Sequence, residues 1–327
     1  MKINMRDVAH HAGVSIATVS HVINNTRFVS DTTRQKVLDA INELGYSPDI
    51  MARIFKTGKK NLIGFIVPDI ANSFFATIIE EVEDVIAQNN FKLIVANTKE
   101  TKQREIDNIR LLTSGIVDGL IVASTLDDFK EIEKIIPENF PMVFIDRVLS
   151  NCPYDSIAIS DYSTIYTSTE NLILAGHKKI GYIAGLNRLS TTAERLDAYE
   201  QALKDYHIPI NSEIIQYTNS MAKGARASVE KLVQQKCTAM IASNNVMTVD
   251  ALIYLNDHGI SVNKDISLIG YSEDERVSDF FPEIDYIKQP IMELGKMAGS
   301  QIIERIKNPQ MKIRNKILYS TLITHRS

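Results

Sequence analysis

Polar side chains that could bind DNA gather in one short stretch near the start of the chain. Residues 12–25 read AGVSIATVSHVINN, in which Val19, Val22 and Ile23 have the i, i+3, i+4 spacing of a helix with one apolar face. The hydroxyl, amide and imidazole groups between them cannot all belong to a core. Such groups form hydrogen bonds with base edges and with phosphate oxygens. We therefore expect a helix whose outer face meets nucleic acid.

The spacing of three small or apolar residues predicts a helix-turn-helix. Ala9 is small where a second helix would cross the first, Gly13 permits the turn, and Val19 fills the angle between the helices. Any small helical hairpin could show the same three residues. Charge therefore has to support the DNA-binding interpretation.

Charge is distributed unevenly along the chain. Residues 1–60 carry nine Lys and Arg against five Asp and Glu, a net charge of +4, whereas the whole chain of 327 residues has −4. The remainder therefore carries −8. A basic head on an acidic body favours a polyanion as the partner of the head, although a solvated charge fluctuation would look the same.

Individual roles follow from position on the second helix. Ile16 and Ala17, at its N-terminal end, would reach base edges in the major groove, and His21 could donate to a guanine. Thr18, Asn24 and Arg27 are better placed for phosphates. The candidate DNA contacts of the head are Ser15, Ile16, Ala17, Thr18, Ser20, His21, Asn24, Arg27, Ser30 and Thr33.

Three short helices must position these residues, within a domain predicted over residues 1–48. The first spans 5–12, and the second, capped by Ser15, spans 16–24. The third begins after its cap Ser30 and ends at Gly45. Its expected inward residues are Val37, Leu38, Ile41 and Leu44. Residues 49–60 read as a linker with a short potential helix that would be ordered only when docked.

From residue 61 short apolar runs alternate with amphipathic stretches, DFKEIEKII (128–136) among the latter. This pattern is typical of parallel sheets covered by helices. The alternation restarts near residue 162, so we predict an α/β body of two doubly wound halves. The first takes residues 61–160 plus 290–320, and the second takes 161–289. Ligands of such sheets bind at the carboxyl ends of the strands, here between the halves.

The sequence contains none of the common catalytic or cofactor-binding motifs considered below. GYIAGLNRL has two glycines without the GxGxxG spacing, KTGKKN lacks the first glycine of a phosphate loop, and GxSxG and HExxH are missing. His10 and His11 read as solvated helix-end residues. We expect no enzyme, cofactor or metal. Two cysteines, no apolar leader and apolar runs of only strand length favour a cytoplasmic protein with no membrane association.

Long stretches of the sequence resemble the LacI/GalR family of bacterial transcription regulators. The most specific is MRDVAHHAGVSIATVSHVINNTRFVSDTTRQKVLDAINELGYSPDIMAR. Later runs that agree are IGFIVPDIANSFFATIIEEVED, VDGLIVAS, GHKKIGYIAG, DISLIGYSEDE and IKQP. The resemblance covers essentially the whole chain. It implies a helix-turn-helix head on two periplasmic-binding-protein-like subdomains.

The resemblance also implies partners. A homodimer would bind a pseudo-palindromic double-stranded DNA operator, each head reading one half-site in the major groove. The linker would form a hinge helix in the minor groove, with Ala52 and Arg53 near the groove floor. Phe55 stands where the family has a leucine that wedges between base pairs. A small-molecule effector in the cleft would control operator affinity, most simply in a repressor of carbohydrate-related genes.

Effector contacts carry over at several positions. Phe74 matches an aromatic residue that packs on the effector, Arg195 matches an arginine that holds it, and the others expected at the cleft are Asn72, Ser73, Asp146 and Asn219. Asn245 and Ser272 depart from the family, which usually has aspartate at both positions. Losing two carboxylates while keeping Arg195 suggests an anionic sugar derivative. A neutral ligand or a lost ligand site is the alternative.

Other regulatory schemes fit the same sequence. The regulator could be independent of an effector, or respond to a phosphorylated carrier protein. A cytosolic solute-binding protein is the rival from a different class, and it would not need a DNA-binding head. Salt-dependent binding to a palindrome separates the regulator from that rival.

Overall fold

A computed structural model describes residues 3–24, 27–46, 60–219, 221, 223–272 and 284–324. The chain divides into two compact units, Met1–Lys60 and Asn61–Ser327, and each is described by itself. No helix in these ranges is long and apolar enough to cross a membrane.

The first unit contains three helices with the predicted bounds: α1 (Met5–Ala12), α2 (Ile16–Asn24) and α3 (Asp31–Leu44). Val8, Val19 and Val37, one from each helix, have no exposed surface and form its core. Gly13 ends α1 with φ +64°, a left-handed conformation that glycine adopts without strain. The helix-turn-helix spacing of the sequence is therefore realised.

Ser15 and Ser30 lie at the predicted starts of α2 and α3. The Ser15 hydroxyl caps α2, since it accepts the N–H of Thr18 at 3.0 Å. Ser30 occupies the predicted N-cap position of α3, but its hydroxyl bonds the hydroxyl of Thr33 at 2.9 Å and caps no backbone N–H.

The inward face of α3 also differs from the prediction at one residue. Leu38 is 40% exposed, whereas Ala40 is buried. Each helical residue turns by about 100°, so positions 37, 40, 41 and 44 share a face that position 38 does not. Leu38 is therefore not a core residue of this unit.

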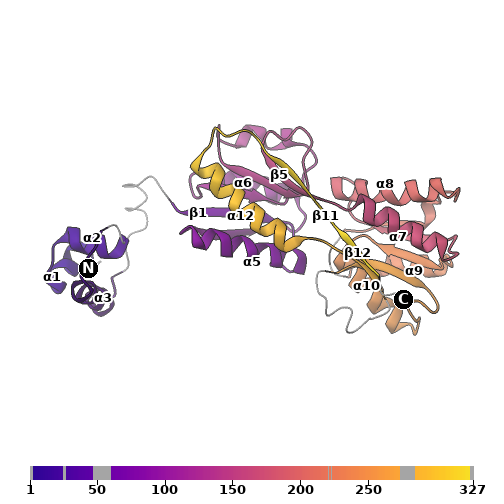
Figure 1. Cartoon of the computed structure of the whole chain (residues 1–327), viewed down its shortest axis with the longest axis horizontal. Coiled ribbons are helices and arrows are strands. Elements are labelled where there is room, and N and C mark those ends of the chain that lie inside the picture. The colour runs from indigo at the N-terminus through magenta and orange to yellow at the C-terminus, as the bar shows by residue number, and fades with distance from the viewer. Residues whose placement is uncertain are drawn as a thin grey trace. The chain divides into compact units, whose positions relative to one another are not determined.

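The second unit begins with a sheet of strand order β11-β5-β4-β3-β1-β2. Its strands are β1 (Leu62–Val67), β2 (Lys92–Asn97), β3 (Gly119–Val122), β4 (Met142–Asp146), β5 (Asp155–Ser160) and β11 (Asn315–Tyr319), all paired in parallel. Helices α5 (Ser73–Gln88) and α12 (Ile291–Lys307) pack on one face, side by side, and α6 (Lys102–Thr113) packs on the other (Figure 1).

A second sheet follows with the order β12-β10-β9-β8-β6-β7. Its strands are β6 (Ile180–Ala184), β7 (Ile215–Tyr217), β8 (Ala239–Ala242), β9 (Ser267–Tyr271), β10 (Asp285–Lys288) and β12 (Thr321–Ile323). Helices α7 (Tyr162–Leu174) and α8 (Ser190–Asp205) cover one face, and α9 (Arg226–Gln234) and α10 (Asn245–Asp257) cover the other. Only β12 runs antiparallel among the described strands, beside β10. The two predicted doubly wound halves are confirmed.

Two segments of the first half differ from expectation. The helix expected over 128–136 is a pair of 3₁₀ turns, Phe129–Glu131 and Glu133–Ile135. Pro137 follows directly and disfavours helical backbone at the residue before it. Strand β5 was not expected because its first residues are polar. It is buried nonetheless, and Asp155 is held by Arg305 at 2.7 Å.

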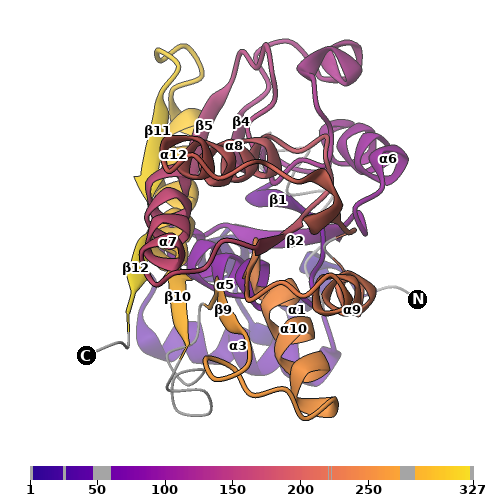
Figure 2. The same cartoon turned by 90° about the vertical axis from the view of Figure 1, so that its right-hand side faces the viewer.

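The chain crosses between the halves in three places. The first crossing follows β5 and the second follows β10. The third is the short connection between β11 and β12, two strands that are nearly continuous along the chain (Figure 2). The crossings are bonded together: the N–H of Ser320 donates to the carbonyl of Ser160 at 3.3 Å, and the hydroxyls of Ser320 and Thr164 are 2.6 Å apart. The halves therefore share a connected hinge.

Helix α12 approaches α5 very closely at Gly295. A Cβ atom built on Gly295 would lie 2.6 Å from the Cβ of Glu81 and 3.0 Å from the carbonyl oxygen of Ile78. Both atoms belong to or adjoin the backbone of α5, so neither can move away cheaply. Glycine is needed here for the distance between the helices and not for a special φ.

We therefore expect Gly295→Ala to lower the free energy of unfolding by about 1–2 kcal/mol, because the overpacking outweighs the better helix propensity of alanine. Urea unfolding followed by circular dichroism measures it. Ser300→Ala, on the exposed side of the same helix, is the control and should be neutral or slightly stabilising. Equal effects of the two variants would contradict the close approach.

Candidate functional site

A cleft between the two halves of the body lies at the carboxyl ends of the strands. Its lining residues are mostly polar or aromatic and come from both halves. They are Asn72, Phe74, Phe75, Asp146, Arg147, Gly185, Leu189, Thr191, Thr192, Arg195, Ser243, Asn244, Asn245 and Gln289. The structure thus brings together five of the predicted effector residues: Asn72, Phe74, Asp146, Arg195 and Asn245.

The start of α5 forms one wall of the cleft. The Asn72 side chain caps this helix by accepting the N–H of Phe74 at 3.0 Å. From the other half, the Asn245 amide donates to Asn72 Oδ1 at 2.6 Å and to Ser73 Oγ at 3.1 Å. Ser73 therefore contacts a cleft residue, although it is not among the described residues that line the cleft, and its role in effector binding stays a prediction.

Arg195 is held in a buried cluster at the hinge. Its guanidinium pairs with Asp161 at 2.6 Å, donates to the Ser243 carbonyl at 2.7 Å, and lies 4.7 Å from the centre of the Tyr271 ring. Asp161 also accepts a hydrogen bond from Gln289 at 3.0 Å. Asp161 and Gln289 follow β5 and β10, so the arginine is fixed to two of the three crossings.

Asp146 and Arg147 form the opposite wall. Asp146 ends β4 with φ +62° and is 7% exposed. Arg147 makes two hydrogen bonds to the Glu100 carboxylate, at 2.8 and 2.9 Å, and its Nε lies 3.7 Å from Asp146 Oδ2. Burial raises the pKa of the Asp146 carboxyl, although Arg147 and Arg195 act in the opposite direction. A left-handed aspartate is strained, and strain of this kind is concentrated at binding sites.

The charges at this site differ from those on which the prediction of an anionic ligand depends. Among the described residues at the cleft, Asp161 neutralises Arg195 and Glu100 neutralises Arg147, which leaves Asp146. Neither Asp161 nor Arg147 was singled out from the sequence. Arg147 had a signal, since it directly follows Asp146. Asp161 had none, because only the fold places it beside Arg195.

Two predicted effector residues lie elsewhere. Asn219 is exposed, and its Oδ1 accepts the N–H of Met221 at 3.1 Å within its own loop. Ser272 is buried at the end of β9, and its N–H donates to the Ile287 carbonyl. Neither is among the described residues that line the cleft, because a short loop and a strand pairing position them instead.

The head exposes much of the predicted DNA-reading set. Ile16 is 45% exposed and Ala17 is exposed, both at the start of α2, and Arg27 and Ser30 are exposed as well. The candidates that are half-buried are Thr18, Ser20, His21 and Thr33.

Some predictions for DNA binding fall outside the described part. They concern Ala52, Arg53 and Phe55 of the linker, together with the side chain of Asn24. Sequence reasoning also passed over Phe28, whose side chain is 96% exposed beside Arg27. Nothing in the periodicity distinguished it from a core residue.

Comparisons with known proteins agree along the whole chain. Residues 4–49 match the family described as bacterial regulatory proteins, lacI family. Residues 60–326 match periplasmic binding proteins and the sugar binding domain of the LacI family. The two matched segments fall in the two compact units.

Individual relatives cover nearly all of the chain. The ribose operon repressor of Haemophilus influenzae is 34% identical over 99% of this chain and 98% of its own. An HTH-type transcriptional repressor PurR of Vibrio vulnificus is 33% identical over 94% and 92%. The crystal structure of a lac repressor dimer, bound to operator and the anti-inducer ONPF, superposes with a TM-score of 0.83 at 26% identity, covering 99% of this chain and 98% of that one.

The raised pKa of Asp146 predicts how stability depends on pH. As pH falls, the folded chain takes up this proton before the unfolded chain, in which aspartate has a pKa of about 3.9. Stability contributed by Asp146 should therefore rise as pH falls through the folded pKa toward that value.

Urea unfolding across the mildly acidic range tests this dependence. The stability of wild type minus that of Asp146→Asn should increase as the pH is lowered. The exposed Asp84→Asn on α5 is the control and should leave the pH slope of wild type in place. A difference that shrinks on acidification would show that the pKa is lowered instead.

Proposed function

Because the chain belongs to the LacI family of bacterial transcriptional regulators, it is a DNA-binding repressor with an effector-binding domain, and we propose that a neutral, polyhydroxylated sugar controls it. The proposal also includes a homodimer on a pseudo-palindromic operator in the cytoplasm. The lac repressor structure supports this assembly by analogy, since that protein is a dimer bound to operator.

Operator reading is proposed for the exposed start of α2. Ile16 and Ala17 have the exposure that contact with base edges in the major groove requires, and Ser15 fixes the start of the helix through its cap. Arg27 and Ser30 are accessible to the phosphate backbone. The minor-groove roles of Ala52, Arg53 and Phe55 remain predictions from the family resemblance.

The Arg195–Asp161 ion pair is the main observation that favours a neutral effector. The sequence favours an anionic ligand because it keeps Arg195 and lacks the two aspartates usual in the family. Asp161 at 2.6 Å removes that basis, and Arg147 is likewise paired with Glu100. A phosphate or carboxylate would be brought close to the Asp146 carboxylate, which would repel it. A neutral sugar avoids this cost.

The rest of the cleft suits a sugar as well. Asp146 supplies carboxylate oxygens that accept hydrogen bonds from hydroxyl groups, and Thr191 and Asn244 add groups that both donate and accept. Phe74 and Phe75 lie 4.9 Å apart in an edge-to-face arrangement and offer an apolar surface to ring carbons. The Haemophilus relative is a ribose operon repressor, which makes a pentose the first candidate.

We predict that D-ribose raises the melting temperature of the purified full-length protein, whereas D-ribose 5-phosphate does not. Binding to the native state alone stabilises a protein by mass action. Differential scanning fluorimetry over a range of ligand concentrations measures the shift. Asp146→Asn should reduce the response to ribose. Stabilisation by the phosphate ester alone would reinstate the anionic ligand.

We also predict that His21→Ala relaxes the choice at a single base pair of the operator, with a loss of about 1–3 kcal/mol for the preferred base. Competition binding against a library of half-site variants at fixed salt measures this. Arg27→Ala is the comparison, since loss of a phosphate contact should weaken all sequences alike and reduce the salt dependence. A uniform loss for His21→Ala would place that residue on the DNA backbone instead.

A further inference from the structure

Beyond the proposed function, we propose that Arg188 is a latch that holds the two halves of the body closed over the cleft. It belongs to the loop between β6 and α8, in the second half. It reaches backbone carbonyl groups of the first half, and those carbonyl groups are fixed in advance by side chains of the first half. Whether the cleft is open or closed then depends on this arginine, whichever ligand occupies the cleft.

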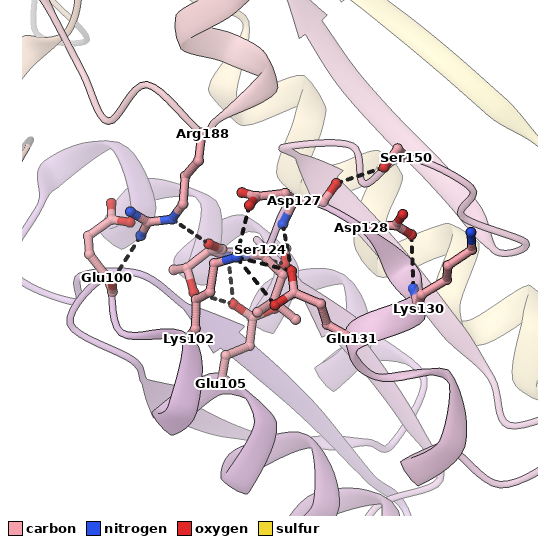
Figure 3. Close-up of polar contacts among 12 residues, drawn as sticks. Glu100, Lys102, Glu105, Ser124, Asp127, Asp128, Lys130, Glu131, Ser150 and Arg188 are labelled. Carbon is pink, nitrogen blue, oxygen red and sulfur yellow. Dashed lines mark hydrogen bonds and ion pairs between the residues drawn. The ribbon is translucent and has the colours of Figure 1, made fainter.

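The latch consists of two hydrogen bonds across the cleft. Arg188 Nε donates to the carbonyl of Thr125 at 3.1 Å, and its Nη2 donates to the carbonyl of Glu100 at 3.1 Å. Figure 3 shows Arg188 reaching from its own loop toward Glu100. A guanidinium is suited to two acceptors at once because its donors are planar and fixed relative to one another.

One acceptor lies in a turn that α6 holds rigidly. Buried Glu105 accepts hydrogen bonds from Ser124 Oγ at 2.5 Å and from the N–H and hydroxyl of Thr125 at 2.5 and 2.6 Å. One helical turn earlier, Lys102 binds Asp127 at 2.8 Å and Glu131 at 3.1 Å (Figure 3). The turn that carries the Thr125 carbonyl is therefore held by two side chains of α6.

The other acceptor lies in a strained segment after β2. Lys99 and Glu100 have φ of +50° and +54°, consecutive left-handed residues that are not glycine. Such backbone persists only where its surroundings fix it. Here the Glu100 N–H donates to the Pro68 carbonyl at 3.2 Å, and the Glu100 carboxylate is bound by Arg147. These contacts therefore maintain the backbone conformation that turns the Glu100 carbonyl toward Arg188.

These contacts separate into two groups. The bonds that shape the acceptors lie within the first half, so they persist when the halves move apart. The two bonds of Arg188 cross between the halves and exist only when the cleft is closed. Arg188 is also not among the described residues that line the cleft, so a ligand can bind without displacing it. The cross-cleft contact of Asn245 with Asn72 differs, because both of those residues line the cleft.

Hydrogen exchange of the ligand-free, full-length protein tests the latch directly. Arg188→Met keeps the aliphatic stem and removes both donors. We expect exchange to become about tenfold faster in peptides covering 98–101, 124–128 and 186–190, as the loss of charge-assisted hydrogen bonds implies. Peptides from β1 and β8 should be unchanged. Arg110→Met, an arginine 61% exposed on α6, is the matched control and should change none of these rates.

A second variant tests the acceptor turn. Glu105→Gln removes one acceptor oxygen from the Ser124–Thr125 turn and should accelerate exchange in the same peptides. Combined with Arg188→Met it should add little, because both act on the same contact. Ser124→Ala replaces Glu105→Gln if that variant fails to fold. If the effects of the two substitutions on the exchange rates were fully additive in free energy, the turn would not position the acceptor.

Binding kinetics extend the test to a ligand. With D-ribose as the probe, Arg188→Met should raise the dissociation rate about tenfold and leave the association rate nearly unchanged. Failure of wild type to bind D-ribose would overturn the proposed sugar, while hydrogen exchange would still decide the latch. Unchanged exchange in Arg188→Met, or equal acceleration throughout the protein, would overturn the latch.

Discussion

The buried guanidinium of Arg195 imposes the constraint on which the cleft depends. A charge in such a site must be paired and hydrogen-bonded, because leaving it unpaired is strongly destabilising. Asp161 and the Ser243 carbonyl meet this requirement. Asp161 follows β5 and is bound by Gln289, which follows β10, so the pair connects the ligand site to the hinge. A ligand that contacts Arg195 therefore also acts on the hinge segments that connect the two halves.

Each half of the body has its own hydrophobic clusters, and the hinge and the cleft contacts join the two halves. This division is what permits an effector to act at a distance. A ligand shifts an equilibrium between two arrangements only if it binds them unequally, and coupling to operator affinity is reciprocal. In such a scheme Arg195 and Asp146 recognise the ligand, whereas Arg188 sets how readily the closed arrangement forms without it.

The head was predictable from sequence because its determinants are local. The cap Ser15, the turn residue Gly13 and the core residue Val19 act within a few positions of one another, and all were found as expected. Two expectations for the head were not fully met because a rule based on nearby residues allowed another outcome. Ser30 found a hydroxyl partner in place of a backbone N–H, and Leu38 lay one residue away from the buried face of its helix.

The sequence by itself determined the family, the helix-turn-helix, the two α/β halves and the cleft residues Asn72, Phe74, Asp146, Arg195 and Asn245. Periodicity, spacing and resemblance are all read along the chain, so they report which residues are present. Only the tertiary structure decided the charge of the site. Arg195 and Asp161 are 34 positions apart, and Arg147 and Glu100 are 47 apart. Electrostatic energy depends on distances through space, and those exist only once the strands and crossings have assembled.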